Sequence, residues 1–218
     1  MTVKITIFDL DGTLLNTLPD LTDSTNQVLD YFNYSHKSID EICSYIGNGV
    51  AKLIELSIPN GITNPNYNTC IDLFKNYYQQ NIFNKTRPYN DVLPLLQELK
   101  SKNIITAVVS NKFDTAVKML TKKYFNNLID VAYGENEQIG IRKKPYPDTI
   151  LKILDEFHIN TKDALYIGDS DTDIQTAKNA SVKCISVSWG YRTKEFLSNN
   201  GASCIIDAPF EIMNYLNS

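Results

Sequence analysis

The stretch Ile7-Phe8-Asp9-Leu10-Asp11-Gly12-Thr13-Leu14 places two aspartates two positions apart, where a run of β-forming residues ends. Residues 3–8 are apolar and β-branched enough to predict a strand that is buried on both faces. Side chains two positions apart on a strand point the same way, so Asp9 and Asp11 share a direction if the extended geometry continues. Gly12 then allows the chain to turn away from the strand.

Two carboxylates this close repel each other unless a cation, a proton or hydrogen bonds compensate their charge. Mg²⁺ is the first candidate, because it is a hard divalent cation that takes oxygen ligands and often binds beside phosphate. The simpler interpretation is a strand-end turn with two solvated aspartates. Asp9 and Asp11 alone do not decide between the two, so the rest of the chain must.

The 218-residue chain fits one large domain, or a core domain that carries a smaller insertion. Its 43% hydrophobic and 21% charged residues are ordinary for a globular protein, and its net charge of −4 provides no basic surface for nucleic acid or a membrane. The four cysteines are scattered and form no C-x-x-C pair, which favours free thiols, and the first residues lack a secretory signal. We therefore expect a cytoplasmic protein, and the sequence leaves open whether it is a monomer or a homodimer.

Short β-branched runs alternate with segments of helical periodicity over most of the chain, which is typical of a parallel α/β sheet. The predicted strands are 3–8, 104–109, 129–132, 163–168, 182–187 and 203–206, and the predicted helices include 112–124, 147–157 and 171–180. The pattern therefore predicts an α/β fold with a Rossmann-like parallel sheet core flanked by helices.

Residues 16–85 are the exception, because they show helical spacing and no convincing strand. An all-helical segment placed directly after the first strand predicts an inserted cap domain. The expected domains are thus an α/β core, 1–15 with 86–218, and a helical cap, 16–85. Within this cap, Gly47-Asn48-Gly49 forms a loop between helices whose two glycines suit a close approach to a small substrate.

Three further polar clusters follow predicted strands, and open α/β sheets bind their ligands at the carboxyl ends of the strands. Ser110-Asn111-Lys112 supplies a hydroxyl and backbone N–H groups at a predicted helix start, which suits an anion. Lys143-Lys144-Pro145-Tyr146-Pro147 holds a lysine between stiffening prolines, and Asp169-Ser170-Asp171-Thr172-Asp173 is a second acidic group. Two acidic clusters, a hydroxyl and a lysine at one sheet edge predict a site for a metal and a phosphate.

Taken in order, these clusters resemble the four motifs of the haloacid dehalogenase-like phosphohydrolase superfamily. The resemblance covers essentially the whole chain, including the helical insertion after the first motif. Within the superfamily, several stretches are similar to phosphoglycolate phosphatases and their close relatives: Ile46-Gly47-Asn48-Gly49, Arg87-Pro88-Tyr89, Ser110-Asn111-Lys112, Lys144-Pro145-Tyr146-Pro147 and Ser188-Trp189-Gly190-Tyr191.

The resemblance implies a role for each acidic residue. Asp9 would be the nucleophile that forms an aspartyl-phosphate, and Asp11 would be the general acid and then the general base. Mg²⁺ would be held by the Asp9 carboxylate, the Asp11 backbone carbonyl and Asp169. Asp173 matches the last acidic position of the fourth motif, as a metal ligand directly or through water.

The resemblance also implies that Ser110, the Asn111 N–H and Lys144 hold the transferring phosphoryl group, with Lys144 offsetting its negative charge. Asp171 does not match the fourth motif, and because it begins a predicted helix we interpret it as a helix cap. Lys143 is interpreted as a solvated neighbour of Lys144.

The implied function is a Mg²⁺-dependent phosphomonoesterase acting on a small phosphorylated metabolite, with 2-phosphoglycolate as the first candidate. Inorganic pyrophosphatase activity, or broad cleavage of sugar and nucleotide phosphates, would use the same site. A different class is a non-catalytic phospho-acceptor module of receiver type, although such modules are shorter and lack the helical insertion. Lys52 and Arg87 are candidate partners for a glycolate carboxylate, but the cap sequence does not name the substrate.

Overall fold

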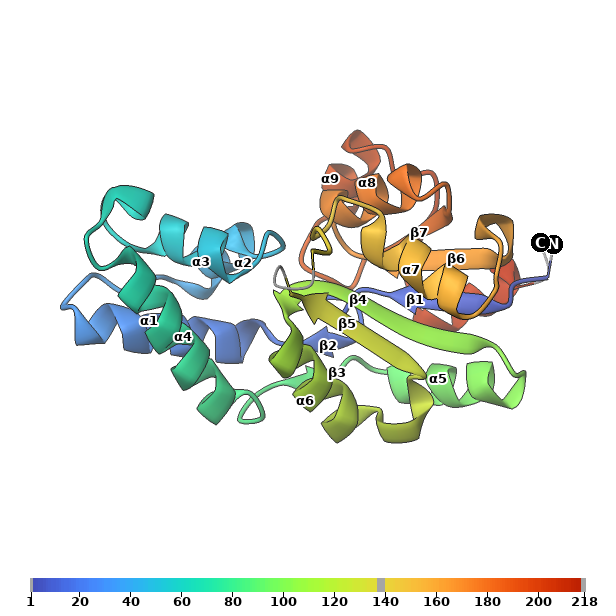
Figure 1. Cartoon of the computed structure of the whole chain (residues 1–218), viewed down its shortest axis with the longest axis horizontal. Coiled ribbons are helices and arrows are strands. Elements are labelled where there is room, and N and C mark those ends of the chain that lie inside the picture. The colour runs from blue at the N-terminus through green and yellow to red at the C-terminus, as the bar shows by residue number, and fades with distance from the viewer. Residues whose placement is uncertain (1, 137–139, 217–218) are drawn as a thin grey trace. The chain divides into compact units, whose positions relative to one another are not determined.

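The computed structural model describes residues 2–136 and 140–216 (Figure 1). The chain divides into two compact units. One comprises Met1–Leu15 with Pro88–Ser218 and is called the α/β unit below, and the other is Asn16–Arg87, called the helical unit. Among the described residues, none of the helices combines the length and the apolar character needed to cross a membrane.

The α/β unit is built on a six-stranded sheet with the strand order β5-β4-β1-β6-β7-β8. Its strands are β1 (Ile5–Phe8), β4 (Ile105–Phe113), β5 (Val131–Glu135), β6 (Ala164–Gly168), β7 (Lys183–Val187) and β8 (Ile205–Ile206). The pairings between neighbouring strands are parallel, and every residue of β1 is buried. These features confirm the predicted Rossmann-like parallel sheet, whose buried strands are continuous apolar runs.

Helices cover both faces of this sheet (Figure 1). Ile150 and Ile153 of one helix and Ala177 of another pack with Ile7 and Tyr166 on one face, while α5 and α6 lie on the other face. The helices of this unit are α5 (Val92–Ser101), α6 (Asp114–Tyr124), α7 (Asp148–Glu156), α8 (Asp171–Asn179) and α9 (Lys194–Asn199), with the short 3₁₀ helices η2 (Asn126–Leu128), η4 (Thr161–Asp163) and η5 (Pro209–Tyr215).

The order of the strands places the end of β1 at a topological switch point. The chain runs from β1 to β4 and β5 on one side, then returns to β6, β7 and β8 on the other. Phe8 lies opposite both Val108 and Ile167, so the residues that come after these three positions lie at the same edge of the sheet. Open α/β sheets bind ligands in the crevice at such a point.

Strand β4 is longer than predicted. It continues to Phe113, which pairs with Glu135, and its register with β5 shifts between Val109 and Phe113. Helix α6 therefore begins at Asp114, and the prediction that residues 110–112 stand at a helix start is wrong. These residues form an irregular strand end instead, a feature that commonly re-aims side chains beside active sites.

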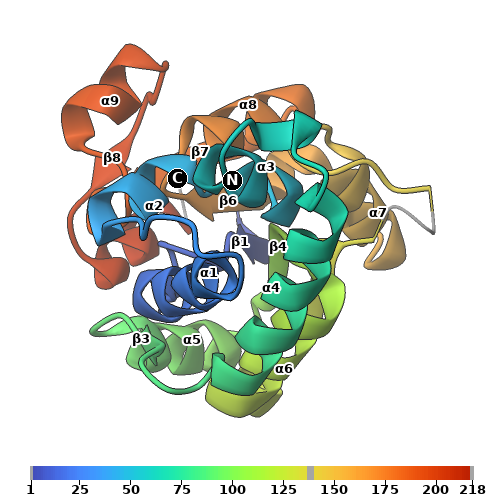
Figure 2. The same ribbon diagram turned by 90° about the vertical axis from the view of Figure 1, so that its left-hand side faces the viewer.

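The helical unit contains α1 (Leu18–Tyr31), α2 (Ile39–Tyr45), α3 (Val50–Ser57), η1 (Gly61–Thr63) and α4 (Tyr67–Asn81), shown from another side in Figure 2. Val28 and Leu29 of α1 and Phe74 of α4 are fully buried, as expected for amphipathic helices that share one small core. Two-residue strands that the sequence did not predict, β2 (Leu15–Asn16) and β3 (Arg87–Pro88), pair where the chain passes between the units.

Candidate active site

A tight turn after β1 sets the positions of Asp9 and Asp11. The Asp9 N–H donates to the Ile167 carbonyl at 2.9 Å, which extends the contact between β1 and β6 by one residue. The Gly12 N–H then donates to the Leu15 carbonyl at 2.9 Å and closes the turn. Gly12 has a φ of +83°, and a Cβ there would collide with the Asp169 carboxylate, so both the backbone and the space require glycine.

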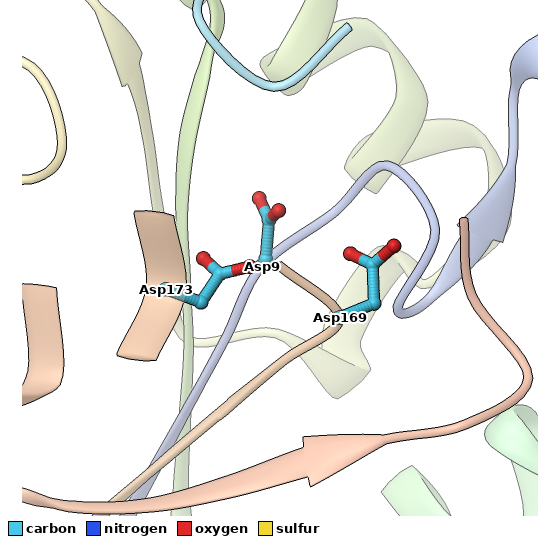
Figure 3. Close-up of side chains that lie close together, drawn as sticks. All are labelled: Asp9, Asp169 and Asp173. Atoms are coloured by element: carbon cyan, nitrogen blue, oxygen red, sulfur yellow. The ribbon is translucent and has the colours of Figure 1, made fainter. Parts of the chain in front are cut away.

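Three buried carboxylates converge at this edge of the sheet (Figure 3). Asp9 follows β1, Asp169 follows β6, and Asp173 belongs to the first turn of α8. One carboxylate oxygen from each of the three lies within 4.8 Å of the others. A set of carboxylate oxygens this close fits a hard divalent cation such as Mg²⁺ better than a soft transition metal.

The electrostatics of this cluster also favour a cation. Burial is the largest cause that raises the pKa of Asp9, to about 8, although the nearby Lys144 acts in the opposite direction. Burial and then Asp173 raise the pKa of Asp169 to about 7. Desolvation and like charge both disfavour the ionised acids, and a bound cation would relieve both effects. The donor set therefore fits the expected metal.

Asp169 is positioned by the loop that follows β7. The Tyr191 N–H donates to Asp169 Oδ2 at 2.7 Å, and the Thr13 hydroxyl donates to Oδ1 at 3.3 Å. The Trp189 indole donates to the Thr13 carbonyl at 3.0 Å, which joins this loop to the turn after β1. A Cβ on Gly190 would collide with the Asp169 Cβ. The sequence stretch around Trp189 thus supports an acidic residue of the cluster, a role that its own residue types do not reveal.

Lys144 connects two members of the cluster. Its Nζ lies 2.9 Å from Asp9 Oδ1 and 2.7 Å from Asp173 Oδ1, and the side chain is buried. Burial opposes the charge of Lys144, but Asp173 and Asp9 together hold its pKa above the ordinary lysine value, so the ammonium stays charged. The Asn111 side chain anchors the Lys144 backbone, accepting from its N–H at 2.8 Å and donating to its carbonyl at 3.1 Å.

Asp173 is held on both oxygens. Oδ1 accepts from Lys144 at 2.7 Å and from the Tyr166 hydroxyl at 2.9 Å, and Oδ2 accepts from the N–H and hydroxyl of Ser170. Ser170 in turn accepts from the Asp173 N–H, which completes a capping box at the start of α8. The interpretation of Asp171 as the cap is therefore wrong. Ser170 takes that role because Asp173, not Asp171, reaches back to the cap residue.

The Asp11 carboxylate is bound by the Lys112 side chain, to which the sequence motifs assign no role. Lys112 Nζ donates to both Asp11 oxygens, at 3.0 and 2.9 Å. The same residue's backbone N–H donates to the Ser110 hydroxyl at 3.3 Å, and residues 110–112 are all buried. The end of β4 therefore brings Ser110, Asn111 and Lys112 to the edge of the sheet where Asp9 and Lys144 lie.

The predicted cap residues lie in the helical unit. Gly47-Asn48-Gly49 connects α2 and α3, with φ values of +113° and +84° at the two glycines. Lys52 pairs with Glu55 at 2.6 Å. Arg87 donates to the backbone carbonyls of Phe83, Asn84 and Thr86. Both side chains thus have partners within their own unit, and their contact with a substrate stays a prediction.

The fold and the site define an α/β protein that is suited to bind a divalent cation and an anionic group at its switch point. The family model of the haloacid dehalogenase-like hydrolases matches residues 6–187 of the chain. The chain belongs to this family, as the sequence motifs predicted.

Curated relatives and solved structures agree with this assignment. The phosphoglycolate phosphatase of Aquifex aeolicus is 31% identical over 190 residues, which cover 87% of this chain and 86% of the relative. That of Haemophilus influenzae (strain 86-028NP) is 28% identical, with 98% of each chain covered.

Two solved structures superpose over almost the full length. A protein of Lactobacillus delbrueckii subsp. bulgaricus shares 33% identity and a TM-score of 0.92, with 99% of both chains covered. A predicted phosphoglycolate phosphatase from Haemophilus somnus shares 28% identity and a TM-score of 0.91, covering 99% of this chain and 98% of that one. Together these relatives indicate an enzyme, a hydrolase of phosphatase type, and set aside the receiver-type alternative.

Proposed function

We propose that the protein is a Mg²⁺-dependent phosphomonoesterase that hydrolyses a small phosphorylated metabolite, with 2-phosphoglycolate as the first candidate. The observation that supports it most directly is the position of Asp9, which lies 2.9 Å from the Lys144 ammonium and within a cluster of buried carboxylates. A nucleophile, a cation site and a fixed positive charge are the parts that phosphoryl transfer requires. The substrate candidate follows from the resemblance of the sequence motifs and is supported by two relatives that are phosphoglycolate phosphatases.

Asp9 and Asp11 divide the chemistry in this proposal. An Asp9 oxygen attacks phosphorus, the ester P–O bond breaks, and Asp11 gives its proton to the leaving oxygen. A water then attacks the phosphorus of the aspartyl-phosphate and loses a proton to Asp11. Inorganic phosphate leaves and the Asp9 carboxylate is restored, so the net reaction consumes one ester and one water.

The Asp9 carboxylate, the Asp11 backbone carbonyl and Asp169 would hold Mg²⁺. When bound, the cation would neutralise the acidic cluster and stabilise charge on the phosphoryl oxygens. Asp173 has a different role, because hydrogen bonds from Lys144, the Tyr166 hydroxyl and both the N–H and the hydroxyl of Ser170 fill the roughly four acceptor positions of its carboxylate. We assign to Asp173 the anchoring of Lys144 and contact with the metal through water.

Three groups would bind the phosphoryl group, two near the C-terminal end of β4 and one before α7. They are the Ser110 hydroxyl, the Asn111 N–H and the Lys144 ammonium. Asn111 contributes twice, since its side chain also fixes the Lys144 backbone. Preorganised donors in a buried site stabilise developing charge more strongly than the same donors in water.

We further propose that residues 16–85 act as a cap that closes over the site and selects small substrates. Closure would exclude water from the reacting group. Changes at a few backbone dihedrals, in the two places where the chain passes between the units, would be enough for such a motion. The Gly47-Asn48-Gly49 loop would then approach the leaving group. This proposal is supported by the position of the helical unit in the sequence, shortly after Asp9 and Asp11.

A panel of phosphate compounds tests this proposal. The purified protein, stripped of metal and then supplied with Mg²⁺, would be assayed with 2-phosphoglycolate, p-nitrophenyl phosphate, sugar and nucleotide monophosphates, and pyrophosphate. We expect turnover of phosphate monoesters with the highest kcat/KM for a small carboxylated ester. A clear preference for pyrophosphate or nucleotides would replace the substrate assignment, and no turnover of any compound would overturn the activity itself.

A further inference from the structure

The ion pair between Lys112 and Asp11 joins a catalytic carboxylate to a buried charge that the proposed mechanism does not use. Lys112 Nζ contacts both Asp11 oxygens, at 3.0 and 2.9 Å, and its side chain is only 3% exposed. The Asp11 side chain is 21% exposed and is not part of the buried cluster of Asp9, Asp169 and Asp173. The Asp11 carboxylate is thus partly exposed, and a buried ammonium contacts both of its oxygens.

A buried ammonium is costly unless its partner is well placed, and an apolar side chain would fill the same space without that cost. The irregular end of β4 nevertheless directs Lys112 to Asp11, over a sequence separation of 101 residues. The same segment directs Asn111 to the Lys144 backbone, and Lys144 contacts Asp9. One short segment thus fixes the surroundings of both carboxylates that the reaction needs.

We propose that Lys112 is a positioning residue that holds the Asp11 carboxyl group at the leaving-group side of the site. This inference rests on the proposed function. A carboxyl group on a turn can rotate about two side-chain bonds, and a fixed ammonium restricts that rotation before substrate arrives. Misplacement of a reacting group by about 1 Å can cost about a hundredfold in rate, so such a restriction has a measurable effect.

The affected step is proton transfer to the ester oxygen. As the bond from Asp9 to phosphorus forms and the ester P–O bond breaks, the proton on Asp11 moves to the departing oxygen. An alkoxide needs this proton, whereas a p-nitrophenolate is stable enough to leave without it. Loss of Lys112 should therefore damage alkyl phosphates far more than aryl phosphates, while loss of a phosphoryl-binding group would damage both.

The test compares kcat/KM for 2-phosphoglycolate and p-nitrophenyl phosphate in Lys112→Met, Lys112→Arg, Asp11→Asn and the double variant Asp11→Asn/Lys112→Met. Lys118→Met is the matched control, because it removes another Lys–Asp pair, with Asp114, on the following helix. We expect Lys112→Met to lose about 10²-fold or more on the alkyl ester, the usual contribution of a general acid, and less than about tenfold on the aryl ester. Lys112→Arg should recover most of the loss.

Two further results support the inference. Asp11→Asn should show the same dependence on the leaving group, and the double variant should be no worse than Asp11→Asn within about threefold, because both changes act on one group. If Lys112→Met does not fold, Lys112→Gln replaces it, since the amide removes the charge but can still donate to Asp11.

Equal losses on both esters, additive losses in the double variant, or wild-type activity in Lys112→Met would each overturn this inference and leave the proposed function standing. A wild-type protein that hydrolyses no compound of the phosphate panel would overturn the proposed function, and this inference with it.

Discussion

The site residues of the α/β unit and the predicted cap loop of the helical unit differ in how deeply they are buried. Asp169 and Asp173 are 2% and 0% exposed, and each accepts hydrogen bonds on both carboxylate oxygens. Gly47 and Asn48 are exposed, and a Cβ added to Gly47 would meet no atom within 4 Å. The acidic groups of the proposed site are thus buried and hydrogen-bonded, whereas the loop that we propose selects the substrate is exposed.

Replacement of the nucleophile should have the largest effect. Asp9→Asn keeps the size of the side chain but cannot attack phosphorus, so we expect kcat below about a hundredth of wild type, a loss of roughly 3 kcal/mol or more of transition-state stabilisation. The measurement is a steady-state assay with p-nitrophenyl phosphate and Mg²⁺. Asp72→Asn, an exposed position in the helical unit, is the control and should keep full activity. An Asp9→Asn variant that keeps more than about a hundredth of the wild-type kcat would show that Asp9 is not the nucleophile.

Loss of the lysine of the cluster should reduce turnover on every substrate alike. Lys144→Met removes the ammonium that contacts Asp9 and Asp173, and the loss of one preorganised donor typically costs about 10²- to 10³-fold in kcat. The neighbouring Lys143→Met is the matched control, because Lys143 is partly exposed and pairs with Glu135 instead. Thermal unfolding would verify that both variants fold. Losses that differ widely between esters would show that Lys144 also takes part in choosing the substrate.

Metal dependence should follow the buried carboxylates. EDTA should abolish activity and Mg²⁺ should restore it, whereas Ca²⁺ should replace it poorly, because Ca²⁺ takes more oxygens at longer distances. Asp169→Ala should raise the Mg²⁺ concentration for half-maximal activity by at least about tenfold, as even outer-shell changes do at metal sites. Asp171→Ala changes an exposed aspartate two positions away and should leave it unchanged. Full activity after thorough removal of metal would contradict the proposed metal site.

Substitution in the Gly47-Asn48-Gly49 loop of the helical unit should change the substrate preference and leave the metal dependence unchanged. Gly47→Ala and Gly201→Ala both place a side chain at a positive φ, +113° and +90°, with open space around it. Each should cost a similar roughly 1–3 kcal/mol of backbone strain. Only Gly47→Ala should change the order of kcat/KM values across a substrate panel, and neither should change the Mg²⁺ requirement. A uniform loss across the panel in Gly47→Ala would make the loop part of the catalytic apparatus instead.

Apolar strands could be predicted from the sequence, whereas a strand end made of polar residues could not. The strands are visible because buried parallel strands are continuous apolar runs, and Asp9 and Asp169 are visible because each directly follows such a run. Lys144 is visible from the order of the motifs and from the prolines that follow it. The extension of β4 to Phe113 was missed, because Ser110, Asn111 and Lys112 are polar and look like a solvated helix start.

These polar residues are buried because of distant partners. Lys112 pairs with Asp11, and Asn111 holds the Lys144 backbone, contacts that span 101 and 33 residues. Local propensity contains no information about such pairs, and the same holds for Tyr191, which binds Asp169 from the loop after β7. In the helical unit the difficulty is different, since Lys52 and Arg87 carry the right charge for a carboxylate but are engaged within that unit.

The smallest expected effect concerns stability rather than rate. In the metal-free protein, burial raises the pKa of Asp9 from 3.8 to about 8 and that of Asp169 from 3.8 to about 7. Between about pH 4 and pH 8 the folded protein therefore binds more protons than the unfolded chain, so its stability falls as the pH rises. The stabilising contribution of the two protonated carboxyl groups is complete below about pH 4. It is lost as the pH rises towards 8. We therefore expect the free energy of unfolding of the protein in EDTA to carry a component that decreases over this range.

Asp9→Asn isolates that component, because the amide does not titrate and removes one negative charge from the cluster. The difference in Tm between Asp9→Asn and wild type in EDTA should be near its minimum at pH 4–5 and should increase towards pH 8, where a gain of about 1 kcal/mol corresponds to about 2–4 °C for a chain of this size. Asp72→Asn should show no such trend, and Mg²⁺ should diminish the difference by stabilising wild type. A difference that decreases with rising pH would mean that Asp9 is ionised in the metal-free fold, and that Lys144 alone balances its charge.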